Sequence, residues 1–207
     1  MNGCVYFVEG ECEKKLLTAL KEQPSVVLPG RVKVRNVVSG LIPKSELLAL
    51  KPNTDVVLVF DMDVPNTNIL KINLENIKKY TRSVRILTVL QVPDFEAEIV
   101  RSTDAKQVKE ITQSKSNTDF KRDFCRLSDC RSTLIKHHFD ISKMWKQKPT
   151  GAYGFLEQRG KDVVCYPMKM RPSPLKCYNK PAVPNTLHGC FLFERRVYDR
   201  DRSFQSA

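Results

Sequence analysis

No stretch of this 207-residue sequence is long and apolar enough to form a membrane-spanning helix, which needs roughly 18 consecutive apolar residues. The first residues also lack the basic leader and the extended hydrophobic segment of a secretory signal peptide. We therefore expect a cytoplasmic protein that has no membrane partner.

Cysteine is present, but not in a pattern that builds a scaffold. The seven cysteines are an odd number without regular spacing, which is typical of reduced thiols and not of a disulfide framework. Cys125, Cys130, His137 and His138 lack the second close pair of ligands that a structural zinc site requires. We expect core cysteines and surface histidines at these positions.

Two further absences narrow the possible functions. The sequence contains no internal repeat, which excludes a solenoid. It also contains no G-x-x-x-x-G-K-[ST] motif, so the chain has no ATPase P-loop of its own.

Positive charge is what the sequence has in excess. The 35 Lys and Arg outnumber the 23 Asp and Glu, which gives a net charge of +12 and a pI near 9.4. Such a balance favours a polyanionic partner, nucleic acid before a membrane surface. Many of these cations fall in the segment 106–136, where we expect nucleic-acid contacts from Lys121, Arg122, Arg126 and Lys136.

Hydrophobic patterning in the first half of the chain alternates between strand and helix. Short apolar runs predict strands at 4–8, 31–38, 55–60 and 84–92, and helical spacing predicts helices at 11–20, 43–50, 66–80 and 95–100. This alternation predicts an α/β protein of the Rossmann-like kind, with about four mainly parallel strands flanked by helices.

The second half has a different character, so we expect three regions. Residues 1–103 would form the α/β core, and residues 104–150 a helical basic segment. Residues 151–207 include five prolines between Pro167 and Pro184, and they predict an irregular basic extension.

Acidic residues follow the predicted strands at the points where the strands end. Glu9 comes directly after the first strand, and Asp61 and Asp63 come after the third. Glu13 lies one helical turn beyond Glu9. Because parallel strands place their carboxyl ends at one edge of a sheet, these carboxylates should meet. Like charges repel unless a cation lies among them, and Mg²⁺ or Mn²⁺ suits an all-oxygen site.

A third acidic group follows the fourth strand in the stretch VPDFEAEIV. It contains Asp94, Glu96 and Glu98, any of which can complete the site, although Asp94 also suits a helix N-cap. Glu11 is interpreted as a residue of the solvated helix face.

The stretches Val8-Glu9-Gly10 and Asp61-Met62-Asp63 resemble the motifs of the Toprim domain, which topoisomerases, primases and several nucleases share. With Glu13 and the later acidic group, the pattern is most similar to the OLD-like and RloB-like Toprim nucleases. The resemblance covers residues 4 to about 100. It implies a two-metal site with these ligands: Glu9, Glu13, Asp61, Asp63, and Glu96 or Glu98, with Asp94 as an alternative.

The resemblance also implies an activity and partners. The chain would be a divalent-metal-dependent nuclease for DNA or RNA, with Glu9, Asp61 and Asp63 as catalytic residues. Lys146, or alternatively Lys143, would supply a cation for the transition state. Related small proteins act in defence against phage beside an ATPase, so an ATPase partner is implied. A homo-oligomer is compatible with the sequence.

Two other functions fit some of the same residues. The stretch FDMDV resembles the nucleophile motif of haloacid-dehalogenase-like phosphatases, although no downstream acidic pair follows an apolar strand. A non-catalytic Toprim domain that binds nucleic acid or a partner is the third possibility.

Overall fold

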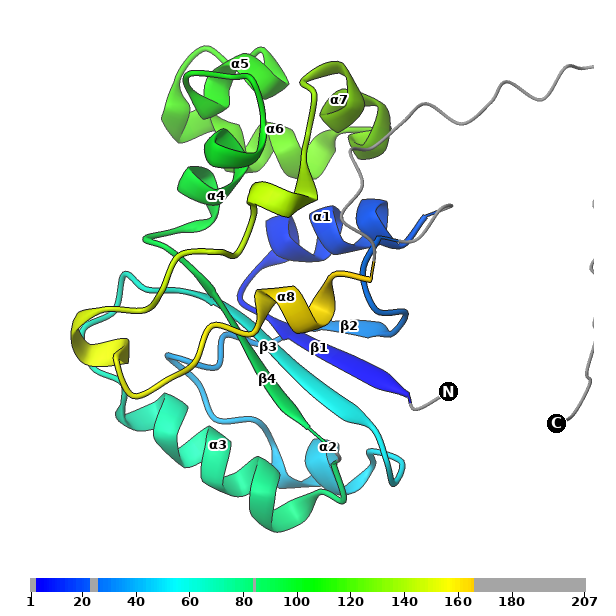
Figure 1. The fold of residues 1–207 in the computed structure, drawn as a ribbon, viewed down its shortest axis with the longest axis vertical. Coiled ribbons are helices and arrows are strands. Elements are labelled where there is room, and N and C mark those ends of the chain that lie inside the picture. Colours follow the sequence, from blue (N-terminus) through cyan, green and yellow to red (C-terminus); the bar gives the residue numbers. More distant parts are fainter. Residues whose placement is uncertain (1–2, 23–25, 84, 166–207) are drawn as a thin grey trace, which may run out of the picture. The chain divides into compact units, whose positions relative to one another are not determined.

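The computed structural model describes residues 3–22, 26–83 and 85–165 (Figure 1). Its centre is a four-stranded sheet in the order β2-β1-β3-β4, in which every neighbouring pair is parallel. The strands are β1 (Cys4–Val8), β2 (Arg31–Val34), β3 (Asp55–Asp61) and β4 (Ile86–Gln91). The predicted Rossmann-like α/β architecture is confirmed.

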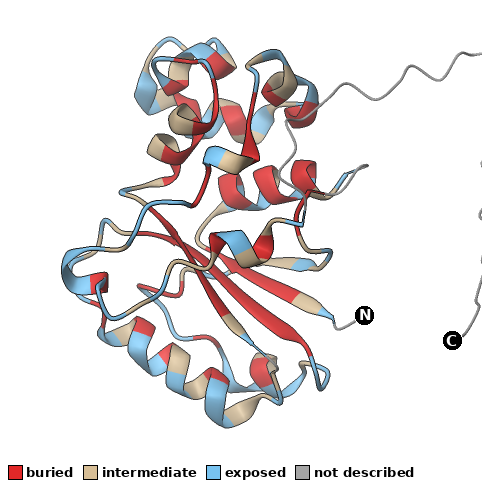
Figure 2. Ribbon diagram, viewed as in Figure 1, coloured by how far each residue is buried: buried red, intermediate tan, exposed pale blue. Residues whose placement is uncertain are grey.

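The two central strands are buried on both faces, which is why they are continuous apolar runs. All seven residues of β3 are buried, and so are four of the five in β1 (Figure 2). Successive side chains point to opposite faces of the sheet, so Tyr6 and Val8 join one hydrophobic cluster while Val5 and Phe7 join the other.

Helices cover both faces of the sheet (Figure 1). The first cluster is shared with α1 (Glu11–Lys21) and α4 (Phe95–Ser102). The second is shared with α2 (Lys44–Leu48) and α3 (Asn68–Tyr80). Within the described part of the chain, no helix has the length and apolar character needed to cross a membrane.

The register of the strands brings the predicted acidic residues to one edge. Val8, the last residue of β1, pairs with Val34 of β2 and with Val59 of β3. The chain therefore leaves β1 at Glu9, close to the end of β3 at Asp61. Asp61 in turn pairs with Gln91, the last residue of β4.

The second predicted strand is shorter than expected, because Asn36 turns the chain. The amide oxygen Oδ1 of Asn36 accepts hydrogen bonds from the backbone N–H groups of Val38 and Ser39, both at 3.0 Å. This local bonding replaces strand pairing, so β2 ends at Val34 and not at Val38.

Residues 104–150 pack onto the core of the sheet and have no separate hydrophobic core. Phe120, Phe124 and Leu134 are fully buried in the same cluster as Phe95 of α4. The elements of this segment are α5 (Val108–Thr112), η1 (Asn117–Asp119), α6 (Phe120–Arg126), α7 (Cys130–Lys136) and η2 (Ile141–Lys143). The helical character predicted for the segment is present, in short pieces.

The described part of the predicted extension also belongs to this unit. It contains η3 (Gly151–Tyr153) and α8 (Gly160–Val163), and both Tyr153 and Val163 are buried in the core. The boundary predicted at residue 150 is thus not a boundary of packing. Residues 166–207 lie outside the described residues, and so do the prolines on which the prediction rested.

The outer edge of β4 is covered by the segment Glu157–Arg159. The backbone N–H of Arg159 donates to Thr88 O at 2.8 Å. The side chain of Gln158 accepts from the Leu90 N–H at 3.2 Å and donates to Leu90 O at 2.7 Å. This segment therefore satisfies backbone groups that an edge strand would otherwise expose.

Candidate functional site

Glu9 joins the ends of three chain segments through its carboxylate. Its Oε1 atom accepts a hydrogen bond from Asn36 Nδ2 at 2.8 Å, and its Oε2 atom accepts one from the backbone N–H of Asp61 at 3.1 Å. Burial raises the pKa of Glu9, against the lowering effect of the Asp61 amide, and the charge of Asp63 adds to the rise. Glu9 is thus held in one orientation beside the end of β3.

Asp61 is the most strongly perturbed acid of the site. Its side chain is buried, and its Oδ1 atom has neither solvent contact nor a hydrogen-bond partner among the described residues. Burial first, and then the charges of Glu9 and Glu13, raise the pKa of Asp61 to about 8. At neutral pH this carboxyl therefore holds a proton for much of the time.

Glu13 is buried in the first turn of α1. Its Oε2 atom accepts a hydrogen bond from the backbone N–H of Gly10 at 2.9 Å, as in the capping box of a helix N-terminus. Burial raises the pKa of Glu13, and the charge of Glu9 adds to this effect. The same side chain therefore caps α1 and belongs electrostatically to the acidic site.

Asp63 lies at the exposed side of this group. Its side chain is open to solvent, and its charge raises the pKa values of Glu9, Asp61 and Tyr153. The structure thus brings together the four acids predicted after β1 and β3.

The three acids that follow β4 have three different roles. Asp94 caps α4, since its Oδ1 atom accepts from the Ala97 N–H at 2.8 Å. Glu98 is fully buried, with Oε2 accepting from the Trp145 N–H at 2.8 Å and Oε1 lying 2.6 Å from Arg101 Nη1. Because both of its oxygens are engaged inside the fold, Glu98 is a structural residue here. Glu96 remains as the acid that faces the site.

Lys121 supplies the positive charge of the site. Its Nζ atom lies 3.2 Å from Oε2 of Glu96. Burial alone would lower the pKa of Lys121, but Glu96 raises it, with further contributions from Asp61 and Glu13. Its charge in turn opposes the raised pKa values of Glu9, Glu13 and Asp61. The sequence prediction gave Lys121 a nucleic-acid contact, and the structure places its exposed side chain beside Glu96 and the other carboxylates.

The other predicted cations lie elsewhere. Lys146 is exposed and lines a cavity beside Met144 and Trp145, and none of the predicted metal ligands lines that cavity. Arg122 is ion-paired with Asp119 at 2.7 Å and with Asp123 at 2.9 Å. Arg126 and Lys136 are exposed on α6 and α7, as a nucleic-acid contact requires.

Two cysteine thiols connect helix α1, which carries Glu13, to helix α6, which carries Lys121. Cys12 Sγ in α1 lies 3.1 Å from Cys125 Sγ in α6, and it also lies 3.4 Å from the backbone oxygen of Lys121. Cys12 is buried and both cysteines are free thiols. These contacts fix the start of α6 against the start of α1, and so place Lys121 near the carboxylates.

The donor chemistry of the site fits a divalent cation, although its side chains are not arranged around one point. Among the described residues, no three His, Cys, Asp or Glu side chains form a ready-made metal group. Three of the acids are instead held by other partners: Glu9 by Asn36, Glu13 by Gly10, and Glu96 by Lys121. The buried, unpartnered oxygen of Asp61 is the donor that a hard cation would satisfy.

Sequence reasoning missed Asn36 as a site residue, and it gave Lys121 a nucleic-acid contact but no place beside the acids. The position of Asn36 after β2, at the same edge of the sheet as Glu9, is a signal that could have found it. Lys121 had no such signal, because the packing of α6 against α1 brings it to the site.

Comparisons of the chain with protein-family models, with curated proteins and with solved structures gave no match.

Proposed function

We propose that this protein hydrolyses phosphodiester bonds in nucleic acid with the help of divalent cations. The observation that carries the proposal is the buried, unpartnered Oδ1 atom of Asp61, surrounded by the charges of Glu9, Glu13 and Asp63 at the carboxyl ends of parallel strands. A fold does not retain such repulsion for stability, so a binding role for a cation accounts for it.

The Toprim-type resemblance gives the proposal its reaction class. The ligands would be Asp61, Glu9, Glu13 and Asp63, with Glu96 as the acid from α4. When bound, Mg²⁺ or Mn²⁺ ions would polarise a phosphoryl oxygen and lower the pKa of an attacking water. Glu98 is left out of this set, because its oxygens serve Trp145 and Arg101.

The protein's own residues then have defined tasks. Glu9 is held by two hydrogen bonds, and burial raises its pKa, which makes its carboxylate a better proton acceptor from water. Lys121 would release Glu96 and stabilise the negative charge that builds up on the phosphoryl group. We assign to Lys121 the role that the sequence alone suggested for Lys146.

The net charge of +12 supports nucleic acid as the substrate class. Phosphates must approach a site that is itself acidic, so cations around it are needed to attract them. Arg126 and Lys136 are exposed candidates for these contacts. Binding should weaken steeply with salt, because counterions are released when phosphates are bound.

The experiment is a cleavage assay with purified protein on plasmid DNA, single-stranded DNA and RNA. Activity should require Mg²⁺ or Mn²⁺, and Asp61→Asn and Glu9→Gln should abolish it. Glu11→Gln is the matched control, because Glu11 follows Glu9 by two residues but is exposed and paired with Lys14. Cleavage by Asp61→Asn at the parent rate would refute the metal site.

The same samples distinguish the alternatives. Hydrolysis of small phosphate esters, with a beryllofluoride adduct at Asp61, would identify a phosphatase. Metal-independent binding without cleavage of any nucleic acid would identify a binding module.

Regulation by an ATPase partner is part of the proposal, because the small Toprim nucleases that the sequence resembles act beside an ATPase. Co-expression with the product of the neighbouring gene, followed by size-exclusion chromatography, tests for such a complex. A protein that stays monomeric and cuts at full rate alone would contradict the two-component system in phage defence.

A further inference from the structure

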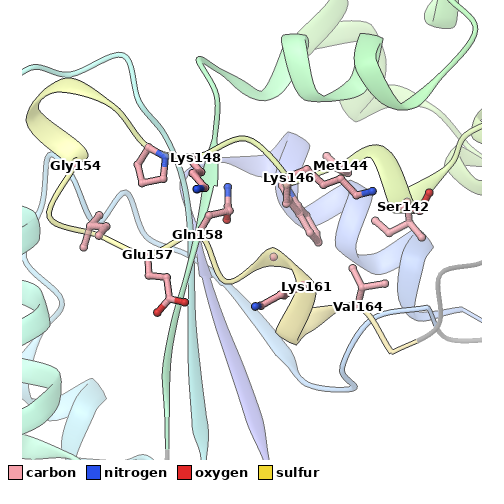
Figure 3. A pocket seen from close by; sticks show the side chains of 14 residues that line it. Ser142, Met144, Lys146, Lys148, Gly154, Glu157, Gln158, Lys161 and Val164 are labelled. Atoms are coloured by element: carbon pink, nitrogen blue, oxygen red, sulfur yellow. The ribbon is translucent and has the colours of Figure 1, made fainter.

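A cavity lies apart from the acidic site, between the segment 141–149 and the helix α8 (Figure 3). Its volume is about 780 Å³, within the range of roughly 300–1,000 Å³ that is usual for small-molecule sites. None of the predicted metal ligands lines it. Its ligand would therefore be bound independently of the acids.

The cavity wall is anchored to the fold at several points. Trp145 donates its backbone N–H to the buried Glu98, and a Cβ atom on Gly160 would lie only 2.4 Å from Cβ of Trp145. Helix α8 thus packs directly on Trp145. Gln158 fixes the opposite side by its hydrogen bonds to Leu90. These contacts hold Trp145, Gly160 and Gln158 in place in the wall of an open cavity.

The lining combines an apolar part with positive charge. Pro149, Leu156 and Val164 are partly exposed and supply apolar surface, while Met144 and Trp145 lie buried in the wall behind it. The indole N–H of Trp145 is buried without a hydrogen-bond partner in the described part of the chain. Lys146, Lys148 and Lys161 stand around this surface, with their side chains visible in Figure 3.

The positive charge of these lysines is not compensated locally. Among the described residues, none of the three forms an ion pair with a carboxylate, and all three are exposed. The one acid of the lining, Glu157, lies 3.0 Å from Arg159 and is paired with it. The cavity therefore presents a net positive rim over an apolar floor.

We propose that this cavity binds a mononucleotide. The apolar part would receive the base, and the lysines would bind the phosphates. The chain's own residues 166–207 are the competing occupant, since they continue from the wall of the cavity. They hold eight Lys and Arg against three Asp and Glu, a net charge of +5 (8 − 3), which would be repelled by the same lysines. Charge complementarity thus favours an external anion.

The chain offers a direct test, because Trp145 is its only tryptophan and lines the cavity. The full-length protein is titrated with ADP, adenosine or inorganic phosphate, and Trp145 emission is followed with correction for absorbance. Calorimetry on the same samples gives the affinity independently. ADP should cause a saturable change, and adenosine should bind at least tenfold more weakly.

Charge reversal tests the lysines. Lys146→Glu with Lys161→Glu should weaken ADP binding tenfold or more, whereas Lys51→Glu, an exposed lysine outside the cavity, should leave it unchanged. Asp61→Asn should bind ADP like the parent, so failure of the nuclease proposal does not affect this one. Circular dichroism verifies that each variant is folded.

Three results would overturn the inference: no saturable change in Trp145 emission up to millimolar ADP, equal binding of adenosine and ADP, or ADP binding that the double charge reversal leaves intact.

Discussion

The Nζ atom of Lys121 lies 3.2 Å from the Oε2 atom of Glu96, so a cation from helix α6 closes an acidic site built at the ends of three strands. Glu96 alone does not account for the environment of Lys121, because Asp61 and Glu13 also raise its pKa. This ammonium group is the main neutralising charge that the described residues place among these acids. Removing this charge should raise the pKa values of Glu9, Glu13 and Asp61.

Lys121→Ala should lower nuclease activity by about 100-fold, the usual effect of removing one group that stabilises the transition state. The pH at which activity rises should also increase in this variant. The reason is that loss of the positive charge raises the pKa values of Glu9 and Asp61 further. A pH–rate profile measures both effects. Arg122→Ala is the control on the same helix. Equal loss in both variants, with no shift of the profile, would mean that general substrate attraction and not the site is affected.

Asp61→Asn should stabilise the metal-free protein at neutral and alkaline pH. The pKa of Asp61 in the folded state, about 8, lies above its ordinary value of 3.8, so folding favours the protonated carboxyl. That stabilisation is complete below about pH 4 and is lost as pH rises from 4 to 8. At pH 9 the variant should therefore be more stable than the parent by up to about 6 kcal/mol, at about 1.4 kcal/mol for each pKa unit.

Chemical denaturation at a series of pH values measures this difference. The two proteins should converge in acid and diverge in alkali. If the difference in free energy of unfolding between the parent and Asp61→Asn stays constant across this pH range, Asp61 is not held protonated.

Divalent metal should raise the melting temperature of the parent. Binding at 100 times the dissociation constant stabilises by about 2.7 kcal/mol, which corresponds to roughly 5–10 °C for a chain of this size. Binding must displace the proton of Asp61, so affinity for Mn²⁺ should increase with pH up to about 8. Differential scanning fluorimetry with and without chelator measures the shift. Glu9→Gln should lose it and Glu11→Gln should keep it.

Glu98→Ala should behave as a structural variant. It leaves Arg101 without its partner and the buried N–H of Trp145 without an acceptor, and breaking a buried pair in this way costs about 3–5 kcal/mol. Thermal melts should show the loss, while the shift caused by Mn²⁺ persists in the fraction that folds. Glu96→Ala should show the reverse pattern, with little loss of stability and a smaller metal shift. An abolished metal shift in folded Glu98→Ala would restore Glu98 as a ligand.

The sheet could be predicted because its signals are local. Buried parallel strands require continuous apolar runs, and the run at 55–60 corresponds to β3 within one residue. The end of β2 was missed, since it depends on the side chain of Asn36 and not on hydrophobicity. The region after 103 was harder for another reason. Its short helices form because Phe120 and Phe124 pack on Phe95, which is a tertiary contact.

The acids of the site followed from the same logic. Glu9 and Asp61 lie where two strands end, and the rule for parallel sheets brings such positions together. The rule does not say how each side chain is oriented, so it could not separate Glu96 from Glu98. That difference arises because residues 98 and 96 of one helix face opposite ways, one towards Trp145 and the other towards Lys121.

The cover over β4 has a consequence for how copies of this protein can assemble. Gln158 and Arg159 occupy the hydrogen-bonding positions along Thr88 and Leu90, so an incoming strand cannot pair there. In the described part of the chain, β2 is then the edge at which the sheet could be extended. If β2 is the one edge strand open to pairing, two copies can extend the sheet only by pairing β2 with β2 across a twofold axis. This pairing leaves neither copy with an open edge strand. Such sheet extension ends at a closed dimer and does not propagate into fibres.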